Sequence, residues 1–265
     1  MILPHEVAKL EDARLALAIS ELADESLPIG GGFACYGGSA ESWMNLVVGV
    51  GMESPVTDED LDRVITFYKA HHAEPRVEVC PFADPSLPRG LGERGFRLAE
   101  FETVLYRELE DAPRPTLPTG VTLEPLDPAE DTQLGAFVDA HVACFAPDGG
   151  ARAAGMAEGA RRMALHPRTT AWLVRVDGEL AGGAAIETLD VSGTLGTLIA
   201  AGILPPYRRR GIQRALIDYR CAAARRAGCT LATISSDPQS ATGRNALRAG
   251  FVTAYTKAIL ARQGG

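Results

Sequence analysis

One stretch of the sequence limits the possible folds more than any other. An apolar, β-prone run ends at Leu204, two prolines follow, and three arginines then precede a single glycine, Gly211. From there to Ala227 the apolar residues recur at helical spacing, and Gly228 ends the pattern as a C-cap glycine does. A strand joined by a stiff turn to a helix start is a building unit of α/β folds, so the pattern predicts that fold class.

The same stretch has the chemistry of a phosphate site. A helix N-terminus carries unpaired N–H groups and a partial positive charge, and Gly211 lets the backbone approach an anion. Between Arg208 and Arg226 there are seven arginines and one acid, Asp218, although the whole chain has a net charge of −8. A local basic cluster on an acidic protein indicates a specific anion site, and we predict that it cradles a pyrophosphate.

The rest of the second half alternates between strand and helix patterns. Asp177-Gly178 is a turn signal between two short β runs, which predicts a hairpin. Helices are predicted at 131–144, 151–164, 211–227 and 242–249, and strands at 171–176, 180–186, 194–204, 230–235 and 251–260.

The first half repeats part of this order. Gly95-Phe96 corresponds to Gly250-Phe251, and aligning these pairs brings a strand at 77–80 onto the strand at 230–235. Four elements keep their order and spacing in this alignment, which indicates an internal duplication. The other elements predicted in this half are a β run at 43–51, helices at 61–71 and 91–96, and a strand at 99–109.

A proline-rich stretch separates the two halves. Asp111–Gly120 contains three prolines, a glycine and two threonines, which remove backbone donors and disfavour regular structure. The charge changes at the same place, because residues 1–114 hold 10 basic and 21 acidic residues and residues 115–265 hold 16 and 13. We therefore predict two domains, 1–112 and 113–265.

Composition and charge exclude several classes of protein. Apolar residues make up 46% and charged residues 23%, which is typical of a globular chain and not of a disordered one. The net charge of −8 argues against a nucleic-acid partner, and no run is long and apolar enough to predict a membrane segment or signal peptide. Five scattered cysteines without a CxxC pattern indicate reduced thiols, so we expect a cytoplasmic protein; a homodimer stays open.

With Arg208-Arg209-Arg210-Gly211-Ile212-Gln213 the sequence resembles the GNAT superfamily of acyl-CoA-dependent N-acyltransferases. The superfamily signature, Arg/Gln-x-x-Gly-x-Gly/Ala, also lies between a strand and a helix. Gln213 stands here where the superfamily usually has a small residue. A second block, Asn245-x-x-x-x-Gly-Phe, resembles the segment that the superfamily has downstream, and the clear resemblance covers about residues 120–262.

This resemblance implies a mixed, mostly antiparallel central sheet flanked by helices, in two tandem copies of which the first is degenerate. It also implies acetyl-CoA as the acyl donor, no metal, and a primary amine of a small molecule or peptide as the acceptor. The pantetheine arm is expected at a splayed strand end and the pyrophosphate at the helix start. The residues implied to bind acetyl-CoA are Gly202, Ile203, Leu204, Arg208, Arg209, Arg210, Gly211, Ile212, Gln213, Arg214 and Asn245.

The catalytic groups depart from the superfamily pattern. A glutamate base and a tyrosine acid are usual near the positions of Ala200 and Ala246, neither of which is ionisable. Glu187, at the end of the predicted hairpin strand, and Tyr255, on the last predicted strand, are the candidate replacements as base and acid; the alternatives are a solvated carboxylate and a sheet-packing tyrosine. Direct transfer by positioning, with protons relayed through water, is a further option.

Other polar residues favour structural interpretations. His141 lies one turn from Cys144 and follows the apolar spacing of its helix, which favours a half-buried structural histidine. His71-His72 are adjacent and point apart at a helix end, so they predict no metal site. The glycines between residues 30 and 38 match no phosphate motif and predict a flexible loop that could border an acceptor site.

The first half lacks the arginine cradle. The corresponding positions fall within residues 53–60, which hold four acids. Thr57 or Asp58 is a typical N-cap, and acids in a first helical turn suit the helix dipole but would repel a pyrophosphate. We therefore expect no CoA in this half.

Two other functions compete with acetyl transfer. Because the usual acid and base are absent, the protein could be a non-catalytic CoA-binding or sensor module. It could also be a structural α/β protein whose arginines bind a partner or an anion. Thiol release with a panel of amines separates an enzyme from a sensor, and stabilisation by CoA separates a sensor from a structural protein.

Overall fold

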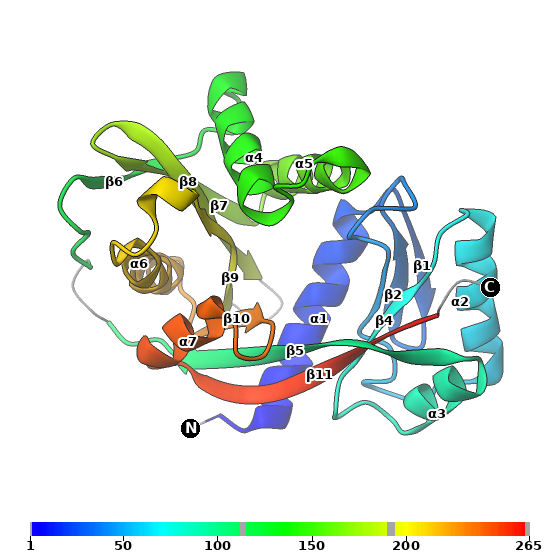
Figure 1. The fold of residues 1–265 in the computed structure, drawn as a ribbon. Helices are drawn as coiled ribbons and strands as arrows, with labels where there is room; N and C mark the ends of the chain where they lie inside the picture. Colours follow the sequence, from blue (N-terminus) through cyan, green and yellow to red (C-terminus); the bar gives the residue numbers. More distant parts are fainter. Residues whose placement is uncertain (1, 112–114, 190–193, 263–265) are drawn as a thin grey trace. The chain divides into compact units, whose positions relative to one another are not determined.

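The chain folds into a mixed α/β structure with a large, mostly antiparallel sheet flanked by helices (Figure 1). The computed structural model describes residues 2–111, 115–189 and 194–262. Two compact units are present: unit 1 comprises Met1–Val104, Ser236–Pro238 and Thr253–Gly265, and unit 2 comprises Leu105–Ser235 and Gln239–Val252. The predicted boundary between residues 112 and 113 lies outside the described residues.

Unit 1 has the strand order β1-β2-β3-β4-β11-β5, so the last strand of the chain lies between two strands of the first half. β3 and β4 are parallel, whereas β1/β2, β2/β3 and β4/β11 are antiparallel. The elements are α1 (Pro4–Leu22), β1 (Glu25–Ile29), β2 (Gly32–Tyr36), β3 (Leu46–Val48), α2 (Asp58–Ala70), β4 (Arg76–Val79), α3 (Ser86–Glu93), the first part of β5 (Phe96–Glu108) and most of β11 (Val252–Arg262).

The strands of unit 1 are covered by helices on both faces. Leu46 and Val48 of β3 pack in one cluster with Ile19 of α1. Val47, which points to the opposite face, packs with residues of α2 and α3. This double burial explains why β3 is a continuous apolar run and not an alternating one.

The glycines at 30–32 form a tight turn, so the prediction of a flexible loop is wrong. β1 and β2 make a hairpin in which Ile29 is in register with Gly32. Gly30 and Gly31 between them have φ angles of 52° and 83°. Positive φ at both central residues is typical of the type I′ turn, whose twist suits a two-residue hairpin.

Unit 2 has the strand order β5-β10-β9-β8-β7-β6. β9 and β10 are parallel, and β6/β7, β7/β8 and β8/β9 are antiparallel. The helices and strands predicted for this half are confirmed, with ends shifted by a few residues. Two elements were not predicted, β6 (Val121–Pro125) and the 3₁₀ helix η1 (Pro205–Tyr207). The other elements of unit 2 are α4 (Asp131–Phe145), α5 (Gly150–Leu165), β7 (Thr169–Val176), β8 (Glu179–Leu189), β9 (Leu195–Ile203), α6 (Ile212–Arg226), β10 (Leu231–Ser236) and α7 (Ala241–Arg248), together with the end of β5.

Helices also cover both faces of the sheet in unit 2 (Figure 1). Ala171 and Leu173 of β7 pack in one cluster with residues of α4 and α5. Trp172 and Val174, which point to the other face, pack in clusters that contain residues of α6. The sheet between these layers holds the strand from which the candidate site is built.

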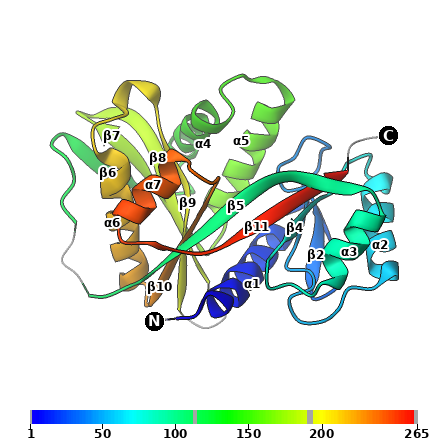
Figure 2. The ribbon, with the colours of Figure 1, turned by 60° about the horizontal axis from the view of Figure 1, so that its bottom comes forward.

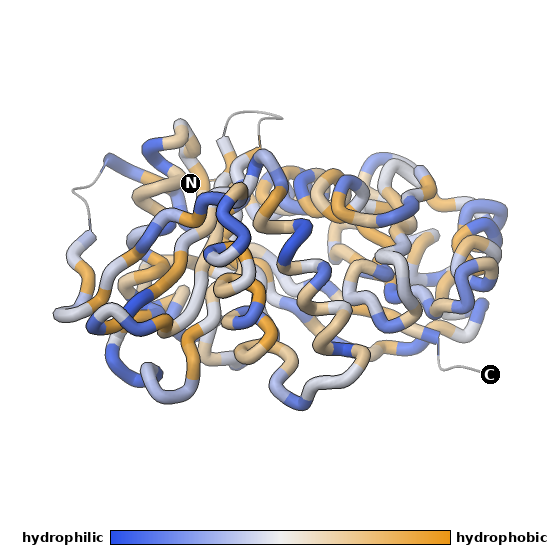
Figure 3. The backbone as a smooth tube through the Cα atoms, turned by 90° about the horizontal axis from the view of Figure 1, so that it is seen from above, coloured by the Kyte–Doolittle hydropathy of each residue, from blue (hydrophilic) through white to orange (hydrophobic). Residues whose placement is uncertain are grey.

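Apolar segments are short along the whole chain. In Figure 3 they alternate with polar segments, as expected for elements with one face toward a core. Within the described ranges, none of the helices combines the length and the apolar character needed to span a bilayer.

Candidate functional site

Strand β9 is paired along one edge and only partly paired along the other, whose unpaired part is called its free edge. On one side it pairs with β8, and on the other its register with β10 runs from Leu195/Leu231 to Thr197/Thr233. The hydroxyls of Thr197 and Thr233 are 2.8 Å apart where this pairing ends, and Figure 2 shows the two strands separating. In the described part of the chain, residues 198–203 have no register with β10, so this edge can offer backbone groups to a ligand.

A β-bulge distorts β9 beside this free edge. The register of β8 with β9 shifts between Gly183 and Ala185, and Ala200 has a left-handed φ of 53°. The guanidinium of Arg220, which is 1% exposed, donates hydrogen bonds to the carbonyls of Ala185 (3.3 Å) and Ile199 (3.1 Å). Burial lowers the pKa of Arg220 to about 10, so the side chain remains charged at neutral pH.

The turn from β9 to α6 presents backbone N–H groups. Gly211 has a left-handed φ of 75° and caps α6, and its carbonyl accepts from the Ala215 N–H (3.2 Å). The N–H groups of residues 211–214 precede this bond, as at any helix N-terminus. A Cβ added to Gly211 would meet nothing within 4 Å, so the space beside it is open and glycine is required for its φ.

The side chains of Arg209 and Arg210 lie at the surface beside the turn. Both residues are exposed, and the guanidinium carbon of Arg210 lies 5.6 Å from the centre of the Tyr207 ring. This distance suits a cation–π contact, which keeps the Arg210 side chain beside the turn. Positive charge is therefore available next to the N–H groups of the helix start.

Arg208 and Arg214 are already used within the fold. The Arg208 Nε donates to the Ile203 carbonyl (2.8 Å). The Arg214 Nε pairs with Asp218 (3.1 Å), and another of its nitrogens donates to the carbonyl of Arg248. These contacts stiffen the turn and α6, and either guanidinium would have to share its donors with a bound anion.

Gln213 and Cys144 approach the free part of β9. The Gln213 Nε2 donates to the Ala201 carbonyl (3.3 Å). A Cβ added to Gly202 would lie 2.7 Å from the Cys144 Sγ, so only glycine fits at that position. Burial raises the pKa of the Cys144 thiol, and the nearby Arg208 opposes this effect only in part. The thiol is therefore neutral at pH 7.

Two further predicted residues have structural surroundings. His141 is half-buried on α4, its ring stacked on Phe137 and tilted against Phe145, and burial lowers its pKa to about 4. Its half-buried position among aromatic rings agrees with the structural interpretation. Asn245 is half-buried on α7, and its backbone carbonyl accepts from the Ala249 N–H (3.0 Å). A role of Asn245 in ligand binding stays a prediction.

The two candidate catalytic residues lie in different units. Glu187 is in register with Thr197, toward the opposite end of β9 from Gly202. It is 4% exposed, and its Oε1 lies 3.6 Å from a guanidinium nitrogen of Arg168, so it is a buried ion-paired group and not a solvated carboxylate. Tyr255 belongs to unit 1 and is 5% exposed. Burial raises its pKa, and among the described residues its hydroxyl has no hydrogen-bond partner. Catalytic roles for both stay predictions.

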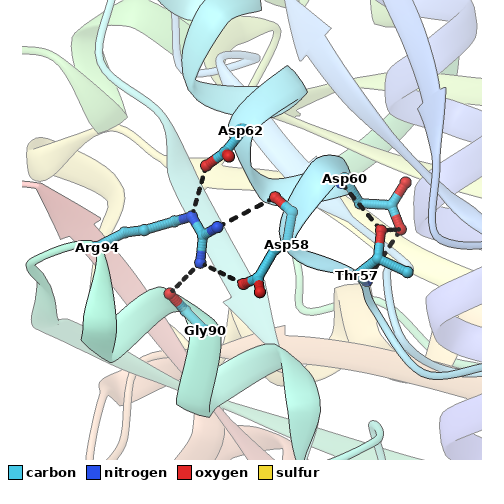
Figure 4. Close-up of polar contacts among 6 residues, drawn as sticks. All are labelled: Thr57, Asp58, Asp60, Asp62, Gly90 and Arg94. Carbon is cyan, nitrogen blue, oxygen red and sulfur yellow. Dashed lines mark hydrogen bonds and ion pairs between the residues drawn. The ribbon is translucent and has the colours of Figure 1, made fainter.

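Helix α2 of unit 1 is capped at its N-terminus by its own side chains (Figure 4). Thr57 is the N-cap, and it exchanges hydrogen bonds of 3.1 Å with Asp60. Arg94 binds Asp58 (2.9 Å) and Asp62 (2.8 Å) beside it. The Asp60 N–H is therefore bonded by the Thr57 hydroxyl, and Arg94 is paired with carboxylates of the same helix, which leaves neither group available to an anion.

No metal site is evident in the parts of the chain that the structure describes. His71 follows the end of α2, as predicted, and stacks on Tyr36. Within those parts, no group of three or more His, Cys, Asp or Glu side chains could hold a metal ion.

Comparison with known proteins agrees with this fold. Residues 128–251 match the acetyltransferase (GNAT) family. A GCN5-related N-acetyltransferase from Kribbella flavida is 20% identical, with 96% of each chain covered and a TM-score of 0.72. A tandem GNAT protein from the clavulanic acid biosynthesis pathway is 12% identical, with 88% of this chain and 80% of that chain covered and a TM-score of 0.61. No curated protein matches the sequence significantly.

The solved structures at these identities share the fold of this chain. Residues 128–251 are a GNAT acetyltransferase domain, and the protein is an acyltransferase. The predicted family and fold class are thereby confirmed.

Proposed function

We propose that the protein transfers an acetyl group from acetyl-CoA to a primary amine of a small molecule or peptide. The observation that carries this proposal is the free edge of β9 at residues 198–203, which leads directly into the open helix start at Gly211. In the proposal the pantetheine arm pairs with the strand edge, and the pyrophosphate binds the N–H groups of residues 211–214. Arg209 and Arg210 supply the compensating charge.

The backbone of β9 can also assist the chemistry. Acyl transfer from a thioester to an amine needs a polarised carbonyl, a neutral amine and a proton for the leaving thiolate. N–H groups on the free edge of β9 are fixed donors of the kind that polarises a carbonyl. Because Ala200 and Ala246 are not ionisable, we propose that positioning and water-relayed proton transfer provide most of the catalysis.

Acetyl-CoA binding tests the proposal directly. At 100 times its Kd, a ligand that binds only the native state stabilises it by about 2.7 kcal/mol, which corresponds to roughly 5–10 °C in melting temperature for a protein of this size. Gly211→Asp places a carboxylate in the cradle and strains the left-handed φ. We expect this variant to lose the shift that acetyl-CoA causes in the wild-type protein.

Gly228→Asp is the matched control for that experiment. Gly228 follows the other end of α6, has a φ of 95°, and also has no atom within 4 Å of an added Cβ. It should lose intrinsic stability but keep the acetyl-CoA shift. If Gly211→Asp also kept the shift, the assignment of the cradle would be refuted.

A non-catalytic CoA-binding or sensor module is the second candidate function. It is favoured by the buried ion pair of Glu187 with Arg168 and by the buried hydroxyl of Tyr255. The test is the release of free CoA thiol from acetyl-CoA with a panel of small amines and peptides. Acceptor-dependent release supports the acetyltransferase, and binding without release supports the sensor.

We propose further that the first half is a degenerate GNAT-like copy without a CoA site. The capping of α2 by Thr57 and Asp60 and the pairing of Arg94 with Asp58 support this. CoA density at α2 in a crystal of the complex would contradict the absence of a CoA site in this half.

We also propose a cytoplasmic location, because all five cysteines are free thiols.

A further inference from the structure

The free edge of β9 carries two carbonyl groups that already have donors. The Leu204 N–H donates to a carbonyl of β8 (2.9 Å), so the Ile203 carbonyl, on the other side of the same peptide, points away from β8. Alternation along the strand directs the Ala201 carbonyl to the same side. Arg208 donates to the Ile203 carbonyl (2.8 Å) and Gln213 to the Ala201 carbonyl (3.3 Å).

The donor at Ala201 comes from the position where the sequence departs from the GNAT signature. A glycine or alanine at position 213 has no side-chain donor and would leave this carbonyl uncovered. Gln213 lies in the first turn of α6 and is half-buried, so its side chain extends from the helix to the strand edge. The contact therefore closes a part of the edge that the usual signature leaves open.

An extended ligand with amide groups needs the same edge. Pantetheine contains two amides, and a chain of this kind pairs with a strand edge through N–H···O=C bonds. For a pantetheine N–H to donate to the Ala201 carbonyl, the Gln213 side-chain amide has to release that carbonyl. Arg208 differs, because its five N–H donors allow it to keep its hydrogen bond to the Ile203 carbonyl and bind a phosphate at the same time.

We propose that Gln213 is a gate on the acyl-donor site, whose side-chain amide covers the Ala201 carbonyl in the free protein and must be displaced by the pantetheine arm. The gate rests on the proposed use of acyl-CoA. It makes Gln213 a residue that sets the affinity for the pantetheine part of the donor and leaves the affinity for the nucleotide part unchanged.

Calorimetric titration with two ligands tests the gate. CoA contains both parts, and 3′-phosphoadenosine 5′-diphosphate contains the pyrophosphate without pantetheine. Removing one competing hydrogen bond in Gln213→Ala should tighten CoA binding by about threefold to tenfold and leave binding of the nucleotide unchanged. Gln133→Ala, which removes an amide from the first turn of α4, should change neither affinity.

The outcomes distinguish the gate from the function on which it rests. Equal or weaker CoA binding by Gln213→Ala overturns the gate, and so does equal tightening for both ligands, since that would place the effect at the phosphates. If the wild-type protein bound neither CoA nor the nucleotide, the proposed function itself would fail.

Discussion

Arg220 shows how a single charged residue can be part of the core. Its neighbours four residues away on α6, Leu216 and Ala224, are buried, so helical spacing places Arg220 on the buried face of the helix. In the sequence it is one of seven arginines in a basic cluster. The structure separates it from the exposed ones, because its guanidinium supplies donors to the carbonyls left by the bulge in β9.

Replacing Arg220 should therefore lower stability more than removing one charge from the surface does. Arg220→Leu leaves the carbonyls of Ala185 and Ile199 buried without donors, and we expect the free energy of unfolding to fall by about 2–5 kcal/mol. Arg226→Leu on the same helix removes an exposed arginine and should cost less than about 1 kcal/mol. Urea denaturation at pH 7 measures both, and equal losses would contradict a structural role for Arg220.

At the scale of elements, an ion cluster ties β11 to its neighbours in unit 1. Lys257 on β11 is 1% exposed, and its Nζ lies 2.5 Å from Glu78 on β4 and 2.9 Å from Glu102 on β5. Burial alone would lower the pKa of Lys257, but these carboxylates raise it. Burial raises the pKa values of Glu78 and Asp12. The position of β11 therefore depends on the charged state of Lys257 and of the carboxylates that pair with it.

This cluster predicts a pH-dependent defect in Lys257→Met. Without its cation the buried Glu78 carboxylate is unpaired, which should cost about 3–5 kcal/mol at pH 7–8. The defect should shrink toward pH 4–5, because burial raises the pKa of Glu78 and the carboxyl then takes up a proton in the folded state. The neutral carboxyl needs no cation. As the pH rises through its folded pKa, the carboxyl loses this proton and the folded state loses stability. Unfolding at several pH values tests this, with the exposed Lys9→Met as control. A defect independent of pH would contradict the role of Glu78.

At the scale of the whole molecule, neither compact unit is a continuous piece of sequence. Unit 1 also includes Ser236–Pro238 and Thr253–Gly265, and unit 2 is interrupted at Ser236–Pro238. The fragment 1–111 lacks the strand that lies between β4 and β5 and the lysine that pairs with Glu78. We therefore expect this fragment alone to show no cooperative urea transition, and to regain one when it is co-expressed with residues 115–265. Cooperative unfolding of the isolated fragment would show that the first half folds without β11.

Helix ends and tight turns depend on residues close together in the chain, and the sequence alone is enough to predict them. The glycine-capped start of α6, the hairpin at Asp177-Gly178 and the N-cap at Thr57 follow from local backbone preferences, and all are observed. The hairpin at Gly30-Gly31 also has a local signal, its glycine pair, although the strand before it contains Pro28. Helix α1 is not predicted by its apolar pattern, because its charged residues Glu11, Asp12 and Arg14 are buried.

Contacts between residues far apart in the chain follow only from the packed structure. The place of β11 between β4 and β5 and the pairing of Lys257 with Glu78 join residues far apart in the sequence, and no local spacing encodes them. The same holds for the free edge of β9, where pairing with β10 stops after Thr197, and for the contact of Gln213 with Ala201. Backbone dihedrals and hydrogen bonds act between neighbours in the chain, whereas strand order and the partners of buried charges are selected by packing the whole chain at once.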